Sequence, residues 1–317
     1  MTGKVVTLFG GSGFIGRYLV QHLAREGCIL RVAVRHPARA NFLKPLGNVG
    51  QITPLPASVQ HDDSLRRAVE GADLVVNLVG ILYESGRRSF QAVHVEGAKR
   101  VAEAAKAAGA KRLVQVSALG ADGTAESRYA RSKAEGEAAV LAAFPEATIV
   151  RPSVVIGPED DFFNRFAAMT RLSPALPLIG GGKTRFQPVF VGDVAEAIAK
   201  LLLEPGHAGK TYELGGPQVY SFEQLMKLLL REIDRKRMLV KVPFGLAALK
   251  ARFLELLPVP PLTRDQVLLL KQDNVVSEGA LTFADLGIEP QAIEAVLPTY
   301  LDQYRIGGRF SLQHHAG

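Results

Sequence analysis

Short apolar runs alternate with longer stretches of helical spacing along the first half of the chain. Between the runs, apolar residues recur every three to four positions, which predicts helices after Gly16 and at 63–70, 90–108 and 129–143. The runs themselves predict buried strands at 5–9, 29–34, 51–56, 73–78, 112–116 and 148–151. Strands that alternate with helices specify a parallel sheet with helices on both faces. The predicted fold class is therefore α/β, with a doubly wound parallel sheet.

A glycine-rich turn joins the first predicted strand to the first helix. In such a strand–turn–helix unit, one glycine allows a tight turn, one lets the backbone approach a pyrophosphate, and one lets helix and strand pack closely. The N–H groups at the helix N-terminus then face the phosphates. This context indicates a Rossmann dinucleotide site rather than a flexible loop. The residues predicted to line it are Gly10, Ser12, Gly13, Phe14, Ile15 and Gly16.

Arg35 follows the second predicted strand, at the place where NAD-binding units usually carry an acid for the adenosine ribose. A guanidinium matches a 2′-phosphate in both geometry and charge. The residue therefore favours NADP(H), with NADPH as the expected cofactor, over NAD. A surface arginine at the end of a strand is the alternative interpretation.

The other predicted strands end in residues that suit the same ligand. Ligands of parallel sheets bind beyond the carboxyl ends of the strands, and residues that directly follow the predicted strands lie at that edge of the sheet. We expect cofactor contacts from Ser58, Val59, Leu78, Val79, Gly80, Ser117 and Pro152.

Tyr129 and Lys133 are four residues apart on a predicted helix, so they share one face. A phenol with an ordinary pKa of about 10 is a poor acid or base at neutral pH until a nearby cation favours the phenolate. The lysine can also bond the nicotinamide ribose. The pair is predicted to contact the cofactor, and to be catalytic if the protein is an enzyme.

The pattern changes after residue 156. Residues 173–184 are rich in Pro and Gly, which predicts an excursion from the sheet. The chain returns at 188–191, and Asp193 is predicted as the N-cap of a helix at 194–203 before a strand at 211–216. Helical patterns dominate beyond 217. We expect a Rossmann domain from 1–156 and 186–216, a smaller, mainly helical domain from 157–185 and 217–305, and a flexible tail at 306–317.

Composition narrows the class of protein. The chain has 317 residues, 47% of them hydrophobic and 22% charged, which is typical of a globular protein. Its one cysteine, Cys28, excludes a disulfide framework and favours a reducing compartment. We see no cleavable signal, no apolar run near the ~18 residues of a membrane span and no metal-ligand cluster. We expect a cytoplasmic protein that can still lie on a membrane.

The positive charge is concentrated in one segment. The chain carries a net charge of +7, and residues 227–252 hold eight basic and two acidic side chains. Nucleic acid, an anionic membrane surface, an acidic protein partner and a merely solvated helix face are all compatible with such a segment. Within and beyond it, Leu246, Leu249, Phe253 and Leu257 repeat at helical spacing, which suits an interfacial helix.

Together, the glycine-rich turn and the Tyr129/Lys133 pair resemble the extended or atypical short-chain dehydrogenases/reductases, and Asp193 fits the same pattern. A closer resemblance, over nearly the whole chain, is to the nucleotide-binding accessory subunits of respiratory complex I, the NADH:ubiquinone oxidoreductase. The most specific stretches are 127–137, 144–147, 151–153, 157–160 and 262–265.

This resemblance implies a tightly held NADPH with a mainly structural role. It also implies partners among complex I subunits near the membrane junction and a peripheral position on the inner face of an energy-transducing membrane. With it, the basic segment 227–252 is expected to meet the membrane surface and no nucleic acid is expected.

Two positions depart from the pattern of the active enzymes. Leu119 occupies the place of a substrate-orienting hydroxyl, and Ser58 replaces an acid after the third strand. Without that hydroxyl, Tyr129 has no evident partner for polarising a carbonyl, so we expect no turnover of a second substrate. An accessory subunit without turnover is the first hypothesis. A free NADPH-dependent reductase or epimerase that uses Tyr129 and Lys133 is the alternative.

Overall fold

The computed structural model describes residues 3–308. Of the predicted tail at 306–317, residues 309–317 lie outside the described residues. The chain divides into two compact units, which are described separately. The first comprises Met1–Pro152, Val191–Leu214 and Glu278–Ile288, and the second comprises Ser153–Phe190, Gly215–Ser277 and Glu289–Gly317.

The first unit is built on a parallel sheet. Within the described chain it has seven strands in the order β11-β6-β5-β4-β1-β2-β3. Strand β1 pairs with β2 on one side and with β4 on the other, so the strand order reverses beside β1. The predicted doubly wound sheet is confirmed. Its strands are β1 (Val5–Phe9), β2 (Ile29–Val34), β3 (Ile52–Pro56), β4 (Leu74–Asn77), β5 (Arg112–Val116), β6 (Thr148–Pro152) and β11 (Thr211–Leu214).

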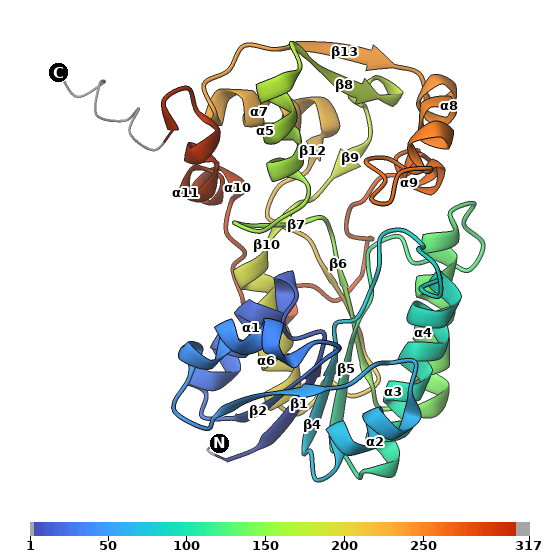
Figure 1. Cartoon of the computed structure of the whole chain (residues 1–317), viewed down its shortest axis with the longest axis vertical. Helices are drawn as coiled ribbons and strands as arrows, with labels where there is room; N and C mark the ends of the chain where they lie inside the picture. The colour runs from blue at the N-terminus through green and yellow to red at the C-terminus, as the bar shows by residue number, and fades with distance from the viewer. Residues whose placement is uncertain (1–2, 309–317) are drawn as a thin grey trace, which may run out of the picture. The chain divides into compact units, whose positions relative to one another are not determined.

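Helices cover both faces of this sheet (Figure 1). One face carries α1 (Phe14–Arg25) and α6 (Val191–Leu203), and the other carries α2 (Asp62–Val69), α3 (Glu96–Ala107) and α4 (Arg128–Ala143). Short 3-10 segments lie at Pro37–Leu46 and Ala284–Leu286. The helices thus leave the carboxyl ends of the strands as one edge of the unit.

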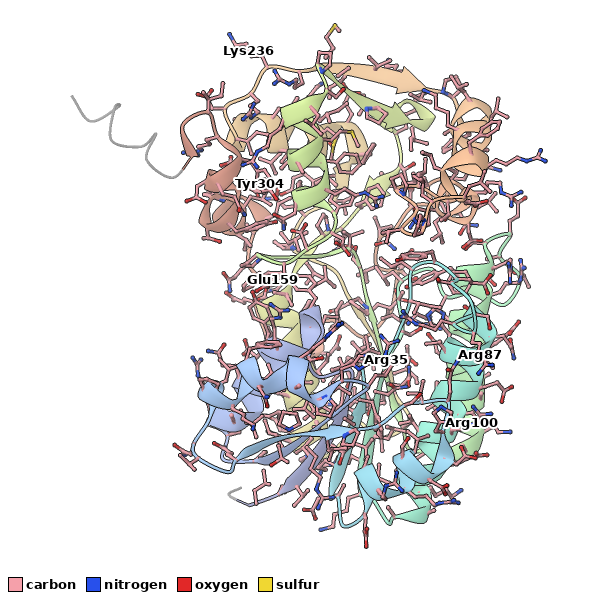
Figure 2. The ribbon with its side chains drawn as sticks, viewed as in Figure 1. Arg35, Arg87, Arg100, Glu159, Lys236 and Tyr304 are labelled. Atoms are coloured by element: carbon pink, nitrogen blue, oxygen red, sulfur yellow. The ribbon has the colours of Figure 1, made fainter. Side chains whose placement is uncertain are left out.

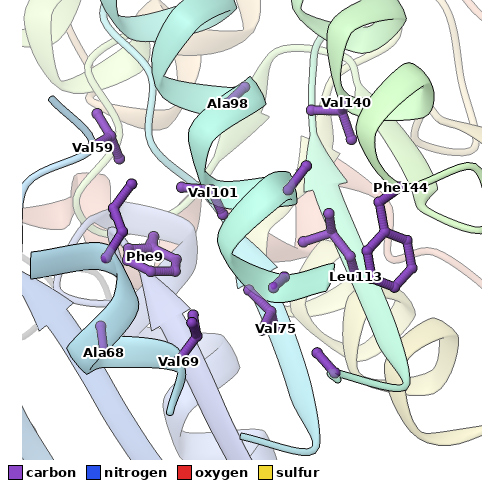
Figure 3. Packing of buried hydrophobic residues seen from close by; sticks show 14 of the residues in the cluster. Phe9, Val59, Ala68, Val69, Val75, Ala98, Val101, Leu113, Val140 and Phe144 are labelled. Atoms are coloured by element: carbon purple, nitrogen blue, oxygen red, sulfur yellow. The ribbon is translucent and has the colours of Figure 1, made fainter. Parts of the chain in front are cut away.

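Small and branched apolar side chains fill the space between the sheet and α2, α3 and α4 (Figure 3). Phe9 and Val75 from the sheet meet Val101 of α3, and Phe144 packs where α4 ends. The alanines of α3 allow it to lie close to the strands, since Ala98, Ala102 and Ala105 are fully or almost fully buried. This packing holds α4, and with it the predicted Tyr129 and Lys133, against the sheet.

Two details of the first unit differ from the sequence-based prediction. The helix predicted at 90–108 begins with a π-helical turn at Gln91–Val95. Asp193 is not an N-cap, because α6 already begins at Val191 and Asp193 lies buried in its first turn. An acid in the first turn still complements the positive end of the helix. The spacing of residues in the sequence could not distinguish an N-cap position from a position in the first turn of the helix.

The segment Glu278–Ile288 belongs to the first unit, although the sequence suggested the smaller domain. It is attached to the end of the sheet, where the Glu213 N–H donates to the Leu281 carbonyl oxygen over 2.8 Å. Leu281 also forms a β-bridge with Tyr212 of β11. The hydrogen bonds of this return segment are long-range, so its own composition does not reveal them.

The second unit is mainly helical with short strand pairs. A pair of strands, β8 (Ala175–Ile179) with β13 (Met238–Val242), was missed, because Pro and Gly near β8 and the basic residues around β13 obscured the pattern. Ser221 caps α7 (Phe222–Glu232) in a capping box with Gln224. The helices are α5 (Phe163–Leu172), α7 (Phe222–Glu232), α8 (Phe244–Leu254), α9 (Arg264–Leu269), α10 (Ile293–Val296) and α11 (Pro298–Leu301), with 3-10 turns at Gly180–Gly182 and Asp302–Tyr304. The strands are β7 (Val155–Ile156), β8 (Ala175–Ile179), β9 (Arg185–Phe186), β10 (Val189–Phe190), β12 (Tyr220–Ser221) and β13 (Met238–Val242).

A search of residues 3–308 for a helix of the length and apolar character needed to cross a bilayer found none.

Candidate functional site

The glycine-rich turn after β1 has the geometry of a phosphate-binding loop. Gly10 has φ +79°, a conformation that side chains disfavour, and its carbonyl oxygen accepts the Gly13 N–H over 2.9 Å. Gly13 is the N-cap of α1 and offers no side-chain acceptor to the first turn of the helix. The first N–H groups of α1 are therefore oriented for an anionic ligand.

The third glycine of the motif is required by space. A Cβ on Gly16 would lie 2.6 Å from the backbone of Gly11, closer than real side chains come. A Cβ on Gly11 would lie 3.0 Å from Cγ1 of Val32 on β2. The first turn of α1 thus packs directly against the glycine-rich turn, which restricts the conformation of the backbone that would face a ligand.

The ends of β1 and β4 meet beside this turn. A Cβ on Gly10 would lie 3.2 Å from the carbonyl carbon of Leu78 and 3.3 Å from the Val79 N. The structure therefore brings together the predicted residues Gly10, Leu78 and Val79, as expected for the point where the strand order reverses. Gly80 follows them.

A buried amide supports this edge, and the sequence did not identify it. The Asn77 Oδ1 accepts the Val79 N–H over 3.1 Å, while its Nδ2 donates to the Gln115 Oε1 over 2.8 Å. Both side chains are buried. The pair links the ends of β4 and β5 and fixes the direction of the chain at Val79. A polar residue at the end of an apolar strand was the available signal.

Arg35 directly follows β2 (Figure 2). Its side chain is exposed, and in the described part of the chain no carboxylate pairs with it. Arg17 of α1 lies over the Phe42 ring, with its guanidinium carbon 5.2 Å from the ring centre. Arg35 is thus available to a ligand at the end of β2.

The two residues predicted after β3 have different environments. The Ser58 N–H donates to the Ser64 Oγ over 3.1 Å, which fixes the turn into α2. Val59 is buried and packs on α3, where a Cβ on Gly97 would lie 2.9 Å from its Cγ2. The Val59 side chain is therefore part of the core of the first unit.

Ser117, at the end of β5, carries an unsatisfied hydroxyl. The residue is 5% exposed, and its Oγ has no hydrogen-bond partner within residues 3–308. Its backbone N–H donates to the Val150 carbonyl oxygen over 2.7 Å, which fixes its position. A buried hydroxyl without a partner is costly, so this atom fits a site that a polar ligand completes. Pro152 ends β6, the neighbouring strand.

Helix α4 presents Tyr129 and Lys133 together, as predicted. Ser127 caps the helix by accepting the Ala130 N–H. The Lys133 Nζ lies 5.8 Å from the centre of the Tyr129 ring and donates to the Val116 carbonyl oxygen over 3.5 Å. Burial lowers the pKa of Lys133 to about 8, although Glu137 acts in the opposite direction. The lysine therefore supplies a poorly solvated ammonium next to the phenol.

Apolar and aromatic groups surround the phenol. Phe90 and His94 each contact the Tyr129 ring edge to face, at centroid distances of 5.8 and 5.4 Å, and Ile81 and Val93 complete the cluster. Leu119 is buried, and its N–H donates to the Pro152 carbonyl oxygen. A leucine offers no hydroxyl to orient a substrate carbonyl. The described groups that contact the Tyr129 ring are therefore chiefly apolar and aromatic.

Buried charges anchor α4 to the sheet, and they too were missed. Arg151 on β6 donates from Nε to Glu137 Oε1 over 3.0 Å and from Nη1 to Glu213 Oε1 over 3.3 Å. Its pKa is raised chiefly by the hydrogen bond to Glu137. The three residues come from three separate elements, so no local spacing reveals them.

Comparisons with known proteins agree with this geometry. The model of the NAD dependent epimerase/dehydratase family matches residues 6–215. The chain is 40% identical to NADH dehydrogenase (ubiquinone) 1 alpha subcomplex subunit 9, mitochondrial, of Arabidopsis thaliana, over 97% of this chain and 80% of the relative. It is 34% identical to the NADH-ubiquinone oxidoreductase 40 kDa subunit of Neurospora crassa, over 98% of this chain and 82% of the relative.

A solved structure shows the same fold at low identity. The NADPH-dependent quinone oxidoreductase QOR2 of Escherichia coli, complexed with NADPH, superposes with a TM-score of 0.74 at 21% identity. The match covers 92% of this chain and 97% of that chain.

Proposed function

Because the chain belongs to the NAD dependent epimerase/dehydratase family, we propose that it binds NADPH and serves as an accessory subunit of NADH:ubiquinone oxidoreductase, respiratory complex I. The observation that supports the role as an accessory subunit is the share of the chain that the similarity covers. The family model ends at residue 215, whereas the 40% identity to a complex I subunit spans 97% of the chain and so includes most of the second unit. A nucleotide fold alone would not require that second unit.

The residues at the sheet edge support the choice of a nucleotide. The turn at 10–16 offers backbone N–H groups to a pyrophosphate, and Ser117 offers a buried hydroxyl that lacks a partner among residues 3–308. The ammonium of Lys133 would bind the ribose next to the nicotinamide. Arg35 favours a 2′-phosphate, and thus NADPH over NADH. The bound nucleotide would supply hydride chemistry, and these side chains would hold and orient it.

In this proposal the nucleotide is mainly structural. A ligand that binds only the folded state stabilises it by RT ln(1 + [L]/Kd), or ~4 kcal/mol at about a thousandfold excess over Kd. Leu119 and the apolar groups around Tyr129 support a role without turnover. The protein therefore contributes a folded, nucleotide-filled unit to the larger assembly.

The second unit supplies a surface for the membrane side of the assembly. The side chains of Leu246, Leu249, Phe253 and Leu257 are 47, 54, 65 and 50% exposed, so the predicted apolar stripe does face solvent. Exposed Lys250 and Arg252 flank it. Apolar side chains with cationic neighbours suit an anionic lipid surface. We therefore infer a peripheral position on the inner face of the energy-transducing membrane, near the complex I subunits at the junction of the peripheral arm and the membrane arm.

Two measurements test the proposal. Denaturing the purified protein should release NADPH at about one molecule per chain, and NADH or no nucleotide would contradict the cofactor assignment. Extraction from its own membranes should yield the protein together with the quinone-reducing assembly. Elution as a separate monomer that is insensitive to salt would contradict the accessory role.

The alternative, a free reductase or epimerase, is favoured by the preserved Tyr129 and Lys133 pair. The variant Tyr129→Phe removes only the hydroxyl and separates the two functions. Unchanged nucleotide retention and unchanged assembly would show that the acid/base chemistry is unused. Loss of an NADPH-consuming activity in this variant would instead support the enzyme.

A further inference from the structure

His94 lies in the π-helical turn next to Tyr129 and Lys133, and the nucleotide site as described does not use it. The side chain is 3% exposed, and its ring stacks on Phe90 at a centroid distance of 5.3 Å. Single π-helical turns are rare and occur frequently at functional sites. The position of a buried histidine in such a turn therefore calls for a specific role.

Both ring nitrogens of His94 have partners, and together they determine its tautomer. The Ile81 N–H donates to Nε2 over 3.0 Å, so this nitrogen carries no proton. In the neutral ring the proton is then on Nδ1, which donates to the Ser132 Oγ over 2.9 Å. Ser132 in turn donates to the Tyr129 carbonyl oxygen over 2.8 Å. The chain of donors runs in one direction, from the loop after β4 to α4.

The π-helical turn places the backbone of His94 directly on α4. A Cβ on Gly136 would lie 2.1 Å from the His94 carbonyl oxygen, so only glycine allows this contact. Ser132 and Gly136 are four residues apart and share a face of α4. That face therefore receives both the backbone and the imidazole of His94.

The same imidazole lies beside the residues that would meet the nicotinamide half of the nucleotide. A Cβ on Gly80 would lie 3.4 Å from the Lys133 Nζ and 3.7 Å from the His94 Nε2. Burial and the nearby Lys133 ammonium lower the pKa of His94 to about 3, so the ring stays neutral over the physiological range. A second cation next to Lys133 is thereby avoided.

We propose that His94 is a positioning residue that fastens the Gly80–Ile81 backbone to α4 and so holds Lys133 and Tyr129 in place for the nicotinamide half of the nucleotide. The assignment rests on the proposed nucleotide site. A positioning role differs from a general packing role in one expected result. If His94 only positions the nicotinamide half, binding of the adenosine half at Arg35 and the glycine-rich turn does not depend on His94.

The test compares two ligands and four proteins. NADPH and adenosine 2′,5′-bisphosphate are titrated into the parent protein, His94→Phe, His94→Gln and Ser132→Ala. His94→Phe keeps a flat ring against Phe90 but leaves the Ile81 N–H without an acceptor. It should weaken NADPH binding by about tenfold and leave binding of adenosine 2′,5′-bisphosphate unchanged. His94→Gln restores an acceptor for Ile81 and should recover most of the loss.

Ser132→Ala breaks the other end of the connection and removes little volume, so it remains informative if His94→Phe folds poorly. It should show the same selective loss for NADPH. Equal weakening of both ligands, or unchanged NADPH binding in both variants, would overturn the assignment.

Hydrogen exchange separates failure of this assignment from failure of the proposed function. In the protein without nucleotide, His94→Phe should speed exchange of the Ile81 amide and leave the amides of β4 unaffected. If the parent protein binds no NADPH, the proposed function fails, while the Ile81 amide still decides whether His94 fastens this loop. An unchanged Ile81 exchange rate would overturn the role of His94 in either case.

Discussion

Arg151 and Glu137 form a two-bonded ion pair that joins β6 to α4. The Nε–Oε1 and Nη2–Oε2 distances are 3.0 and 2.6 Å, and the Glu137 side chain is 8% exposed. Glu137 is one turn of helix beyond Lys133. The pair therefore holds the helix that presents Tyr129 and Lys133 at a fixed position on the sheet.

Removing the cation from this pair should be strongly destabilising. Arg151→Met leaves Glu137 buried without the cation that pairs with it, and we expect a loss of ~3 kcal/mol in the free energy of unfolding. Urea denaturation at pH 7 measures this loss.

Arg66→Met is the matched control for that variant. Arg66 pairs with Asp63 on α2, and both side chains are largely exposed. Exposed pairs contribute ~0.2–1 kcal/mol, so the control should change stability little. Similar losses in the two variants would show that the buried pair has no special role.

Arg35 should determine the preference between the two pyridine nucleotides. Arg35→Asp replaces the guanidinium with a carboxylate that repels a 2′-phosphate and can accept from ribose hydroxyls. NADPH affinity should fall by at least about tenfold, with a much smaller change for NADH. Titration of both nucleotides measures this.

The control is Arg67→Asp, which makes the same charge change on the exposed surface of α2. It should leave both affinities unchanged. Equal affinities of the parent protein for NADPH and NADH would remove the basis for assigning a 2′-phosphate site to Arg35.

Gly16 should be intolerant of even one methyl group. Gly16→Ala places a Cβ 2.6 Å from the Gly11 backbone, which forces the turn away from α1. We expect a loss of ~1–3 kcal/mol in stability together with weaker nucleotide binding. Thermal unfolding with and without NADPH shows both effects.

Gly123→Ala serves as the comparison, because nothing lies within 4 Å of its Cβ position. This variant should match the parent protein or be slightly more stable. If Gly16→Ala behaved in the same way, the close approach of α1 to the turn would not matter for binding.

The buried imidazole of His94 should make the protein sensitive to acid. Its pKa in the folded state is about 3, below the ordinary value of 6.5. Between these values the unfolded chain binds the extra proton and the folded chain does not, so stability falls as the pH drops from 6.5 to 3. The variant His94→Gln should lose this part of the pH dependence. Unfolding free energies from pH 7 to pH 4 test it, and parallel curves for the two proteins would contradict the burial of a neutral imidazole.

The exposed stripe on α8 should mediate binding to lipid. Replacing Leu249 and Phe253 with Ser removes two large apolar side chains that are more than half exposed, so folding should be preserved. Binding to vesicles with anionic lipid should fall by at least about tenfold, in proportion to the buried apolar area that is lost. Sedimentation with such vesicles measures it.

Val49→Ser is the control, since Val49 is fully exposed in the first unit and far from this stripe in the sequence. It should bind vesicles like the parent protein. If the α8 double variant also bound normally, the basic, apolar segment would be a solvated surface.

The sequence by itself determined the sheet, the glycine-rich turn and the places of Arg35, Tyr129 and Lys133. These features have local signals: buried strands read as continuous apolar runs, a tight turn needs glycine, and residues four apart share a helix face. Position relative to the end of a strand was enough to assign the glycine-rich turn and Arg35 to the same edge of the sheet.

Only the tertiary structure decided the pairing of β8 with β13, the return of Glu278–Ile288 to the first unit, and the partners of His94 and Arg151. Each of these depends on contacts between residues far apart in the chain. Arg151, for example, meets Glu137 and Glu213 from two different elements. A charged or polar residue in a sequence shows that it needs a partner when buried, but which partner it finds is set by packing.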